Sequence, residues 1–440
     1  MSAIITDNHK VFIASMFKDA LSNQETANVY LTFGYHIPWS NDAAPQQANT
    51  SYSTHYEIWR NMIGAKRLTG NDIQHVIRRY DWAANTVYTQ YDQANTSIGN
   101  DNVAFYVVNS EKNVYKCLYN AQSANSTVEP TAINANNVTQ TADGYIWKFM
   151  YKISTAEQIR FMTDAYMPVK KLTENNGSLQ WQVQQNATDG ALYAITITDG
   201  GSGYTNASSL TVTITGDGSL ASATANINVS TNTVSSITVT NPGSGYTNAA
   251  ITISGGGGTG ATARALIGPK GGHGSNPVYE LHGKNVLING RLINNEGNTL
   301  SVDNEFRQIA IIKDPMLYDG VTPAANSVYK QTLDLTVSGT GTNYNKDEDV
   351  YQGASLVAST FRGKVVEYDT TNTTVKLTNV YGTPINDPLI GNESSASKFV
   401  TSIDYPELEL NSGEVLYVDN ILPITRNIDQ TEDFKIVVKF

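Results

Sequence analysis

The chain has 440 residues and a formal net charge of −11, and only 16% of its residues are charged. This length is enough for about three domains of roughly 150 residues each. Nucleic-acid binding requires lysine and arginine to neutralise phosphates, and this acidic chain concentrates neither, so no nucleic-acid partner is expected. The single cysteine, Cys117, excludes an intramolecular disulfide framework and a cysteine-based zinc site.

The polar character of the chain comes mainly from Asn, Thr, Ser, Gln and 25 tyrosines. Because β-branched and aromatic residues suit strands and Asn and Gly suit turns, this composition predicts a mainly β protein with few helices. The first residues lack a basic region followed by an apolar run, and no window holds about 18 consecutive apolar residues. We therefore expect synthesis in a cytoplasm without a signal peptide, and no membrane insertion.

The first predicted element is a helix over residues 7–21. Phe12, Met16 and Ala20 share one face at helical spacing. Packing of this face on a sheet is the favoured interpretation, and docking onto a partner subunit is the alternative.

Strand-like runs then alternate with polar loops as far as about residue 167. The runs 103–109 and 114–119 flank a short polar segment and predict a hairpin. Residues 143–153 form a turn followed by a long aromatic strand. Ser154 and Glu157 have capping-box spacing, which predicts a short helix after that strand.

Residues 190–263 contain an internal duplication. This segment has only two charged residues and holds 13 of the 34 glycines. The sequence Gly-Ser-Gly-Tyr-Thr-Asn-Ala occurs at 201–207 and again at 243–249, with Tyr204 and Tyr246 at equivalent positions. Alternating strands between glycine turns predict a compact, pseudo-symmetric β-sandwich and not a flexible linker.

A second inserted-looking unit lies near residues 350–400. The strand-like runs 363–369 and 374–380 flank a polar turn, which predicts a hairpin within a small barrel or a sheet extension. The last residues alternate apolar and polar, so they are expected to form a strand within a sheet. These patterns divide the chain into segments 1–185, 186–266, 267–345, 346–402 and 403–440.

Chemistry-bearing motifs are missing from the sequence. The six histidines lack metal-ligand spacing, and neither a nucleophile elbow nor a phosphate-binding loop is present. Prolines flank the glycine loop 268–277, so His273 is interpreted as a loop or interface hydrogen-bond partner. Residues 347–349 are three consecutive carboxylates, which suggest calcium or a glycosidase pair but more often form a solvated loop. We expect no enzyme activity, no cofactor and no metal.

Short aromatic-anchored phrases follow one another along the chain. The stretch from Asn28 to Trp82 has the pattern of a strand, a turn, a helix and a strand, packed by Trp39, Trp59 and Trp82. The phrases are Asn28–Gly34, Ile37–Ser40, Ile58–Gly64, Val76–Trp82, Val114–Leu118, Asp143–Trp147, Phe306–Pro315, Ser412–Asn420, Pro423–Ile424 and Asp429–Glu432.

In this order the phrases resemble the baseplate wedge proteins of contractile-tailed phages, the gene-product-8 family of T4-type myoviruses. The resemblance covers roughly half of the chain, mainly residues 28–170, 300–316 and 405–440. The duplication and the unit near 350–400 are departures from the family pattern. They look like elaborations between core strands.

The resemblance implies a multi-layer β-sandwich core with a few helices in loops, interrupted by the inserted small β domains. It also implies a homodimer in the virion tail baseplate, made in the host cytoplasm, beside gene products 6, 7 and 10 of the same wedge. The implied role is mechanical: the subunit would hold wedge geometry during assembly and during the rearrangement that triggers sheath contraction.

Individual residues have competing interpretations. Trp39 and Trp82 serve either internal packing or an interface, with packing favoured. Arg78 and Arg79 either pair internally or meet an acidic partner. A glycan-binding module of the tail is the alternative function, and it requires exposed rings at the two repeated tyrosines. A tail hydrolase is a third hypothesis.

Overall fold

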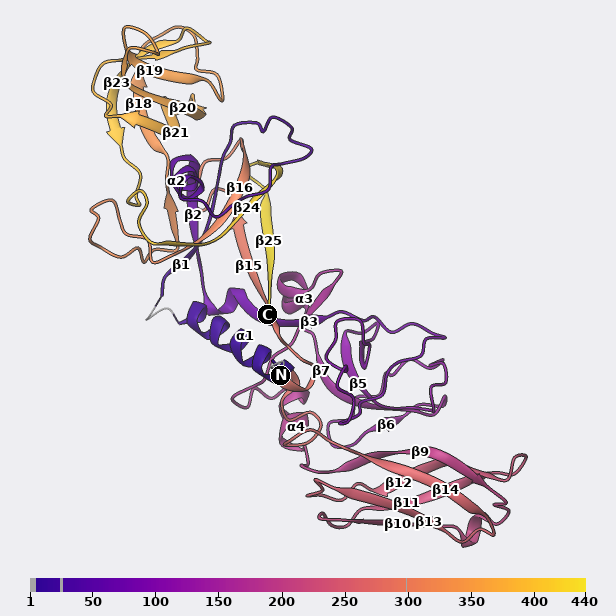
Figure 1. Cartoon of the computed structure of the whole chain (residues 1–440). Coiled ribbons are helices and arrows are strands. Elements are labelled where there is room, and N and C mark those ends of the chain that lie inside the picture. Colours follow the sequence, from indigo (N-terminus) through magenta and orange to yellow (C-terminus); the bar gives the residue numbers. More distant parts are fainter. Residues whose placement is uncertain (1–4, 24–26, 298) are drawn as a thin grey trace. The chain divides into compact units, whose positions relative to one another are not determined.

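The computed structural model describes residues 5–23, 27–297 and 299–440 (Figure 1). The fold is mainly β, with 43% of residues in strands and 12% in helices. The predicted fold class is therefore confirmed.

The chain divides into two compact units. Unit 1 comprises Met1–Met16, Gln74–Leu287 and Val437–Phe440, and unit 2 comprises Phe17–Ile73 and Ile288–Ile436. The single core predicted over 1–185, 267–345 and 403–440 is thus divided between the units. The three tryptophans of the opening stretch do not share one core either: Trp59 is buried in unit 2, whereas Trp82 belongs to unit 1.

Unit 2 is built on a five-stranded antiparallel sheet of order β17-β2-β1-β16-β24. Helix α2 (Tyr52–Asn61) runs directly into β2, and its Trp59 packs in the core with Tyr30. All six residues of β1 are buried, which explains why its sequence, Val-Tyr-Leu-Thr-Phe-Gly, contains no charged residue. The bounds are β1 Val29–Gly34, β2 Met62–Leu68, β16 Asn304–Lys313, β17 Val328–Lys330 and β24 Glu414–Arg426, with a 3-10 turn at Gly70–Asp72.

The same unit contains a closed six-stranded barrel of order β18-β21-β20-β19-β22-β23. Along β18, Leu333, Leu335 and Val337 point inward and alternate with more exposed residues. The sequence left open whether this unit is a small barrel or a sheet extension, and the structure shows a barrel. Its strands are β18 Leu333–Ser338, β19 Asp349–Gly353, β20 Ser359–Asp369, β21 Thr374–Gly382, β22 Pro388–Gly391 and β23 Ser397–Asp404.

Unit 1 contains an aromatic four-stranded sheet of order β4-β5-β7-β6. The pairing of β4 with β5 is antiparallel, as the hairpin prediction required. The predicted capping box is present at the start of α3, where Ser154 and Glu157 cap each other. The bounds are β4 Tyr106–Val108, β5 Asn113–Asn120, β6 Thr139–Gln140, β7 Tyr145–Lys152, α3 Thr155–Phe161, α4 Leu179–Gln185 and α5 Pro277–Glu280.

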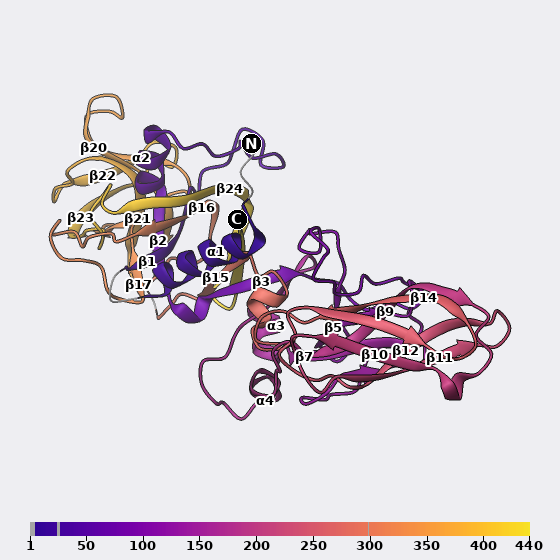
Figure 2. The same cartoon turned by 60° about the horizontal axis from the view of Figure 1, so that its bottom comes forward.

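The duplicated segment forms a small β-sandwich in unit 1. One sheet has the order β10-β13-β14-β9, and β11 pairs with β12. Side chains from both sheets share one apolar cluster, and Figure 2 shows these strands running alongside one another. The bounds are β9 Leu192–Ser202, β10 Thr211–Gly216, β11 Ser222–Asn228, β12 Thr233–Asn241, β13 Ala249–Ser254 and β14 Thr259–Ile267, with a 3-10 turn at Ala207–Ser209.

A further sheet has the order β25-β15-β3-β8. The C-terminal segment forms β25, whose Phe434 and Ile436 are buried. The predicted first helix is α1 (Asp7–Ser22). The remaining bounds are β3 Ile73–Arg78, β8 Tyr166–Pro168, β15 Asn285–Ile293 and β25 Thr431–Lys439.

Candidate functional site

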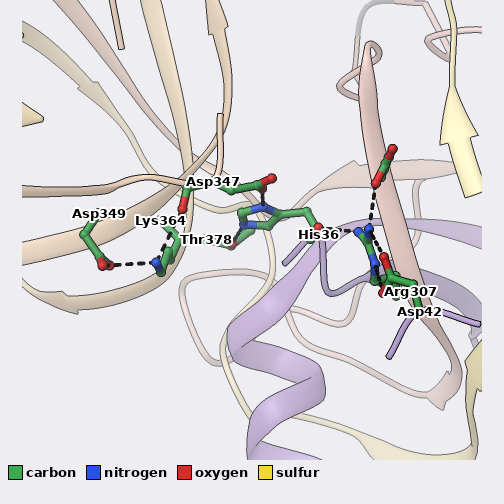
Figure 3. A network of polar contacts seen from close by, with 8 residues as sticks. His36, Asp42, Arg307, Asp347, Asp349, Lys364 and Thr378 are labelled. Atoms are coloured by element: carbon green, nitrogen blue, oxygen red, sulfur yellow. Dashed lines mark hydrogen bonds and ion pairs between the residues drawn. The ribbon is translucent and has the colours of Figure 1, made fainter. Parts of the chain in front are cut away.

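A chain of polar contacts runs through unit 2 between the loop after β1, strand β16 and the barrel (Figure 3). We call it the polar joint. It consists of His36, Asp42, Glu305, Arg307, Asp347, Asp349, Lys364 and Thr378.

His36 lies at the centre of the polar joint and is only 1% exposed. Its Nδ1 is 2.5 Å from Asp347 Oδ1, and its Nε2 is 2.8 Å from Thr378 Oγ1. The order carboxylate, imidazole, hydroxyl is that of a nucleophilic triad. Thr378, however, is 2% exposed, while the Asp347 side chain is 34% exposed. A substrate cannot reach the hydroxyl, so the contacts hold the imidazole in place and do not activate a nucleophile.

Arg307 forms the second half of the polar joint. Its Nε and Nη2 donate to the two oxygens of Asp42 at 3.0 and 2.8 Å, Nη2 also donates to Glu305 at 2.7 Å, and Nη1 donates to the carbonyl of His36 at 2.5 Å. The hydrogen bond from Arg307 holds the pKa of Asp42 below its usual value. Burial alone would lower the pKa of Arg307, but the two carboxylates outweigh burial and raise it. The ion pair therefore stabilises the charged form of both side chains.

The three consecutive carboxylates at 347–349 do not form a solvated loop, contrary to the prediction. Asp347 contacts His36, and Asp349 accepts a hydrogen bond from Lys364 at 3.0 Å. Glu348 is fully buried and accepts hydrogen bonds from the backbone nitrogens of Asn345, Glu393 and Ser394 and from the Ser394 hydroxyl. The sequence did not reveal this result, because the three consecutive side chains point towards different partners.

Unit 1 contains a separate group of charged side chains in its interior. We call it the buried cluster: Lys116 on β5, Lys148 on β7, Glu280 on α5 and His273 in the loop before α5. Lys116 Nζ is 3.1 Å from Glu280 Oε2 and lies 4.0 Å from the centre of the Tyr91 ring. Lys116 and Lys148 have no exposed surface, and Glu280 is 6% exposed.

The buried cluster carries more positive than negative charge. Burial lowers the pKa of Lys148 to about 8 although Glu280 opposes the shift, and burial also lowers the pKa of Lys116. Burial, helped by the two lysines, lowers the pKa of His273 well below its usual value, so the imidazole is neutral. Glu280 additionally accepts hydrogen bonds from the backbone nitrogens of Gly274 and Asn276. The cluster thereby fastens the glycine loop to the aromatic sheet.

His273 is thus not an interface residue. It is 3% exposed, and its ring packs edge-on against Tyr91 at 4.8 Å. His273 lies in the predicted loop, but its buried Nδ1 has no hydrogen-bond partner among the described residues, so the predicted hydrogen-bonding role is not observed. The low exposure also disagrees with the interface interpretation. In the sequence, only the proline-flanked glycine loop drew attention to His273. Nothing in the sequence of β5 or β7 indicated that their lysines would lie near it.

The repeated tyrosines are also interior residues. Tyr204 is 2% and Tyr246 is 4% exposed. A Cβ added to Gly258 would lie 2.5 Å from the Tyr204 ring, and one added to Gly218 would lie 2.4 Å from the Tyr246 ring. In each copy of the repeat, the tyrosine ring therefore packs directly against a glycine of another turn. Neither ring is available to stack on a sugar, so the glycan hypothesis loses the feature on which it depended.

The remaining predicted interface residues make internal contacts but keep some exposed surface. Trp39 stacks on Tyr35 with ring centres 4.0 Å apart. Trp82 donates to the Ser126 hydroxyl at 3.1 Å. Arg79 Nε is 2.8 Å from Asp81, and the Arg78 guanidinium lies 5.1 Å from the centre of the Tyr166 ring.

Helix α1 buries the face opposite to the one that was predicted to pack. Val11 and Ala14 are buried, whereas Phe12 is 51% and Met16 is 56% exposed. Packing of the Phe12 face on a sheet is therefore wrong. Phe12 and Met16 are four residues apart and therefore neighbours on the helix surface, which leaves the docking alternative.

Neither a model of a known protein family nor a curated protein matched the chain. Within the described ranges, no helix is long and apolar enough to cross a membrane. The same ranges contain no group of three or more His, Cys, Asp or Glu side chains suited to hold a metal ion.

Proposed function

We propose that this chain is a structural subunit of the baseplate wedge of a contractile-tailed phage. In this role it is a homodimer in the virion tail, made in the host cytoplasm, and it contacts gene products 6, 7 and 10 of the wedge. It holds wedge geometry through assembly and through the rearrangement that triggers sheath contraction.

The observation that carries this proposal is where the family-like phrases lie in the fold. The phrases at 28–34, 306–315 and 412–420 fall largely on strands β1, β16 and β24, and the phrase at 58–64 covers the end of α2 and the start of β2. These four strands are neighbours in one sheet although they are far apart in sequence. Two others lie on the paired strands β5 and β7. The resemblance thus follows the framework of both units, as expected if it reflects a shared architecture.

The surface and the charge networks support an assembly role in another way. The polar joint and the buried cluster fasten loops to strands, and the triad-like contact in the joint is closed to substrates. Helix α1 offers Phe12 and Met16 to a partner. The glycan alternative gains no comparable support, because its two tyrosines are buried.

Light scattering on the purified chain, followed by co-expression with the neighbouring wedge subunits, tests the proposal. We expect a dimer that joins a stable complex with at least one of those subunits. A chain that stays monomeric and enters no complex would overturn the proposal.

A pair of variants shows whether the helix takes part. Phe12→Asp should reduce the yield of dimer or complex, because a carboxylate would be placed in an apolar contact. Ile159→Asp on α3 is the matched control, since Ile159 is also 51% exposed in the same unit. Equal losses in the two variants would exclude a specific role for α1 while leaving the assembly test itself unaffected.

A further inference from the structure

Unit 2 has an apolar groove where the chain enters and leaves the barrel. Its walls include Tyr318, Pro384, Tyr405, Pro406 and Leu410, and its volume is about 240 Å³. Pockets for whole small molecules usually measure about 300–1,000 Å³. The groove is therefore better matched to one or two anchoring side chains of a protein partner.

The groove displays large apolar side chains on the surface. Tyr318 is 51%, Tyr405 is 38% and Leu410 is 49% exposed. The two tyrosine rings stack with their centres 5.4 Å apart and an interplanar angle of 23°. Tyrosines held in this way provide a rigid contact surface, and tyrosine is enriched among residues that dominate binding energy.

The loop that carries Tyr318 is fixed before any partner arrives. The Tyr318 backbone nitrogen donates to the Glu407 carbonyl at 2.9 Å, and the Leu317 backbone nitrogen donates to the Thr322 carbonyl at 2.7 Å. Asp319 accepts from the backbone nitrogens of Val321 and Thr322 and from the Thr322 hydroxyl. Binding to such a surface costs little ordering entropy.

Four acidic residues are next to lining residues of the groove in the sequence: Asp319, Asp404, Glu407 and Glu409. The Asp319 carboxylate is held by Thr322, and Glu407 accepts a hydrogen bond from the Lys330 backbone nitrogen at 2.6 Å. Lys330, a cation beside them, is already engaged: its Nζ lies 2.8 Å from Asp404 and 3.4 Å from Asp334. Asp404 keeps a side chain that is 70% exposed.

Two arginines of the same unit contact a tyrosine that does not line the groove. Arg60 and Arg362 both lie over the ring of Tyr381, at 5.1 and 4.8 Å from its centre. Val380 and Gly382 line the groove, and Tyr381 between them does not. Successive side chains of a strand point to opposite faces, so Tyr381 points away from the groove. The two arginines that contact Tyr381 therefore lie on the face of β21 that is turned away from the groove.

We propose that this groove binds a short segment of a partner protein in which a proline or apolar side chain is flanked by lysine or arginine. The apolar side chain enters between the tyrosines and prolines, and the cation meets the exposed carboxylate of Asp404, the residue before Tyr405. The inference deepens the proposed function, on which it rests, by naming the chemistry of one wedge contact.

The test is a selection of random twelve-residue peptides on the full-length chain, followed by affinity measurements on the enriched peptides. We expect the enriched sequences to combine proline, leucine or aromatic residues with lysine or arginine. Tyr405→Ser should weaken their binding about 30-fold, since a buried anchor contributes about 2 kcal/mol. Tyr52→Ser, which removes an 81% exposed tyrosine of the same unit, should leave binding unchanged.

Asp404→Asn tests the charged part of the proposal separately. Binding should weaken about threefold at low salt and depend less on salt, because rim charges act mainly through steering. Failure to enrich any peptide, enrichment of acidic peptides, or equal binding to Tyr405→Ser would overturn the inference. Because the selection uses the chain alone, peptide binding without wedge assembly would instead count against the proposed function.

Discussion

Glu280 in unit 1 and Glu348 in the barrel are both buried carboxylates, but they are satisfied in different ways. Glu280 contacts Lys116 and two backbone nitrogens, with Lys148 and His273 nearby. Glu348 is surrounded by three backbone nitrogens and one hydroxyl. The first carboxylate compensates buried cations, and the second organises turns of the barrel. Loss of charge at the two sites should therefore have unequal consequences.

The largest effect is expected for Glu280→Gln. The variant leaves two lysines buried without a counter-charge, and removal of one partner of a buried pair typically costs about 3–5 kcal/mol. Urea unfolding, with peptide-level hydrogen exchange over β5 and β7, measures the loss. Lys170→Met is the control, because the Lys170 ion pair with Glu157 is partly exposed and should contribute less than about 1 kcal/mol. Equal losses would contradict a special role for the cluster.

Lys148→Met should act in the opposite direction and depend on pH. Burial lowers the pKa of Lys148 from 10.5 to about 8 in the folded chain. The unfolded chain therefore binds more protons between about pH 8 and 10.5, so the stability of the wild type rises with pH across that window. Methionine removes the cost of the buried charge and should stabilise the chain at pH 7 by up to about 3 kcal/mol.

The pH profile separates this effect from better packing. The difference between Lys148→Met and wild type should shrink as the pH approaches 10, where the wild-type amine is neutral in the folded chain and the unfolded chain begins to lose its proton as well. A gain in stability that is the same at pH 7 and pH 10 would mean that the charge of Lys148 is not the cause.

Glu348→Gln should have an intermediate effect. An amide retains one acceptor oxygen but places an NH₂ group among donors, so we expect a loss of about 2 kcal/mol. Hydrogen exchange in the turn between β22 and β23 should increase, because the Glu393 and Ser394 nitrogens lose their acceptor. A loss as large as that of Glu280→Gln would show that buried cations are not what separates the two sites.

Local features were the most predictable from sequence. The α1 bounds, the capping box at Ser154 and the strands of the duplication follow from short-range periodicity and turn chemistry. The division into two units was missed because every boundary between the units falls inside a helix or a strand: α1, β3, β15 and β25. No loop of linker-like composition marks these boundaries in the sequence. The orientation of α1 was missed because its apolar residues surround much of the helix, so spacing alone did not identify the buried face.

The charge networks were missed for a different reason. The pair Lys116 and Glu280 is separated by 164 positions, and His36 and Asp347 by 311. Hydrophobic periodicity carries no information on which distant charges meet. Even the conspicuous carboxylates at 347–349 were misassigned, because their partners come from a distant loop, from turns and from strand β20.

The smallest effect is expected at the surface pair of Arg79 and Asp81. Their side chains are 22% and 52% exposed, and exposed pairs contribute between 0 and about 1 kcal/mol. Arg79→Gln should therefore change the free energy of unfolding by less than about 1 kcal/mol, in contrast to the two buried carboxylates. Denaturation in parallel with wedge co-purification then separates the two interpretations of this residue. Unchanged stability with a lower complex yield would assign Arg79 to a partner contact, whereas unchanged stability and yield would leave it a solvated internal pair.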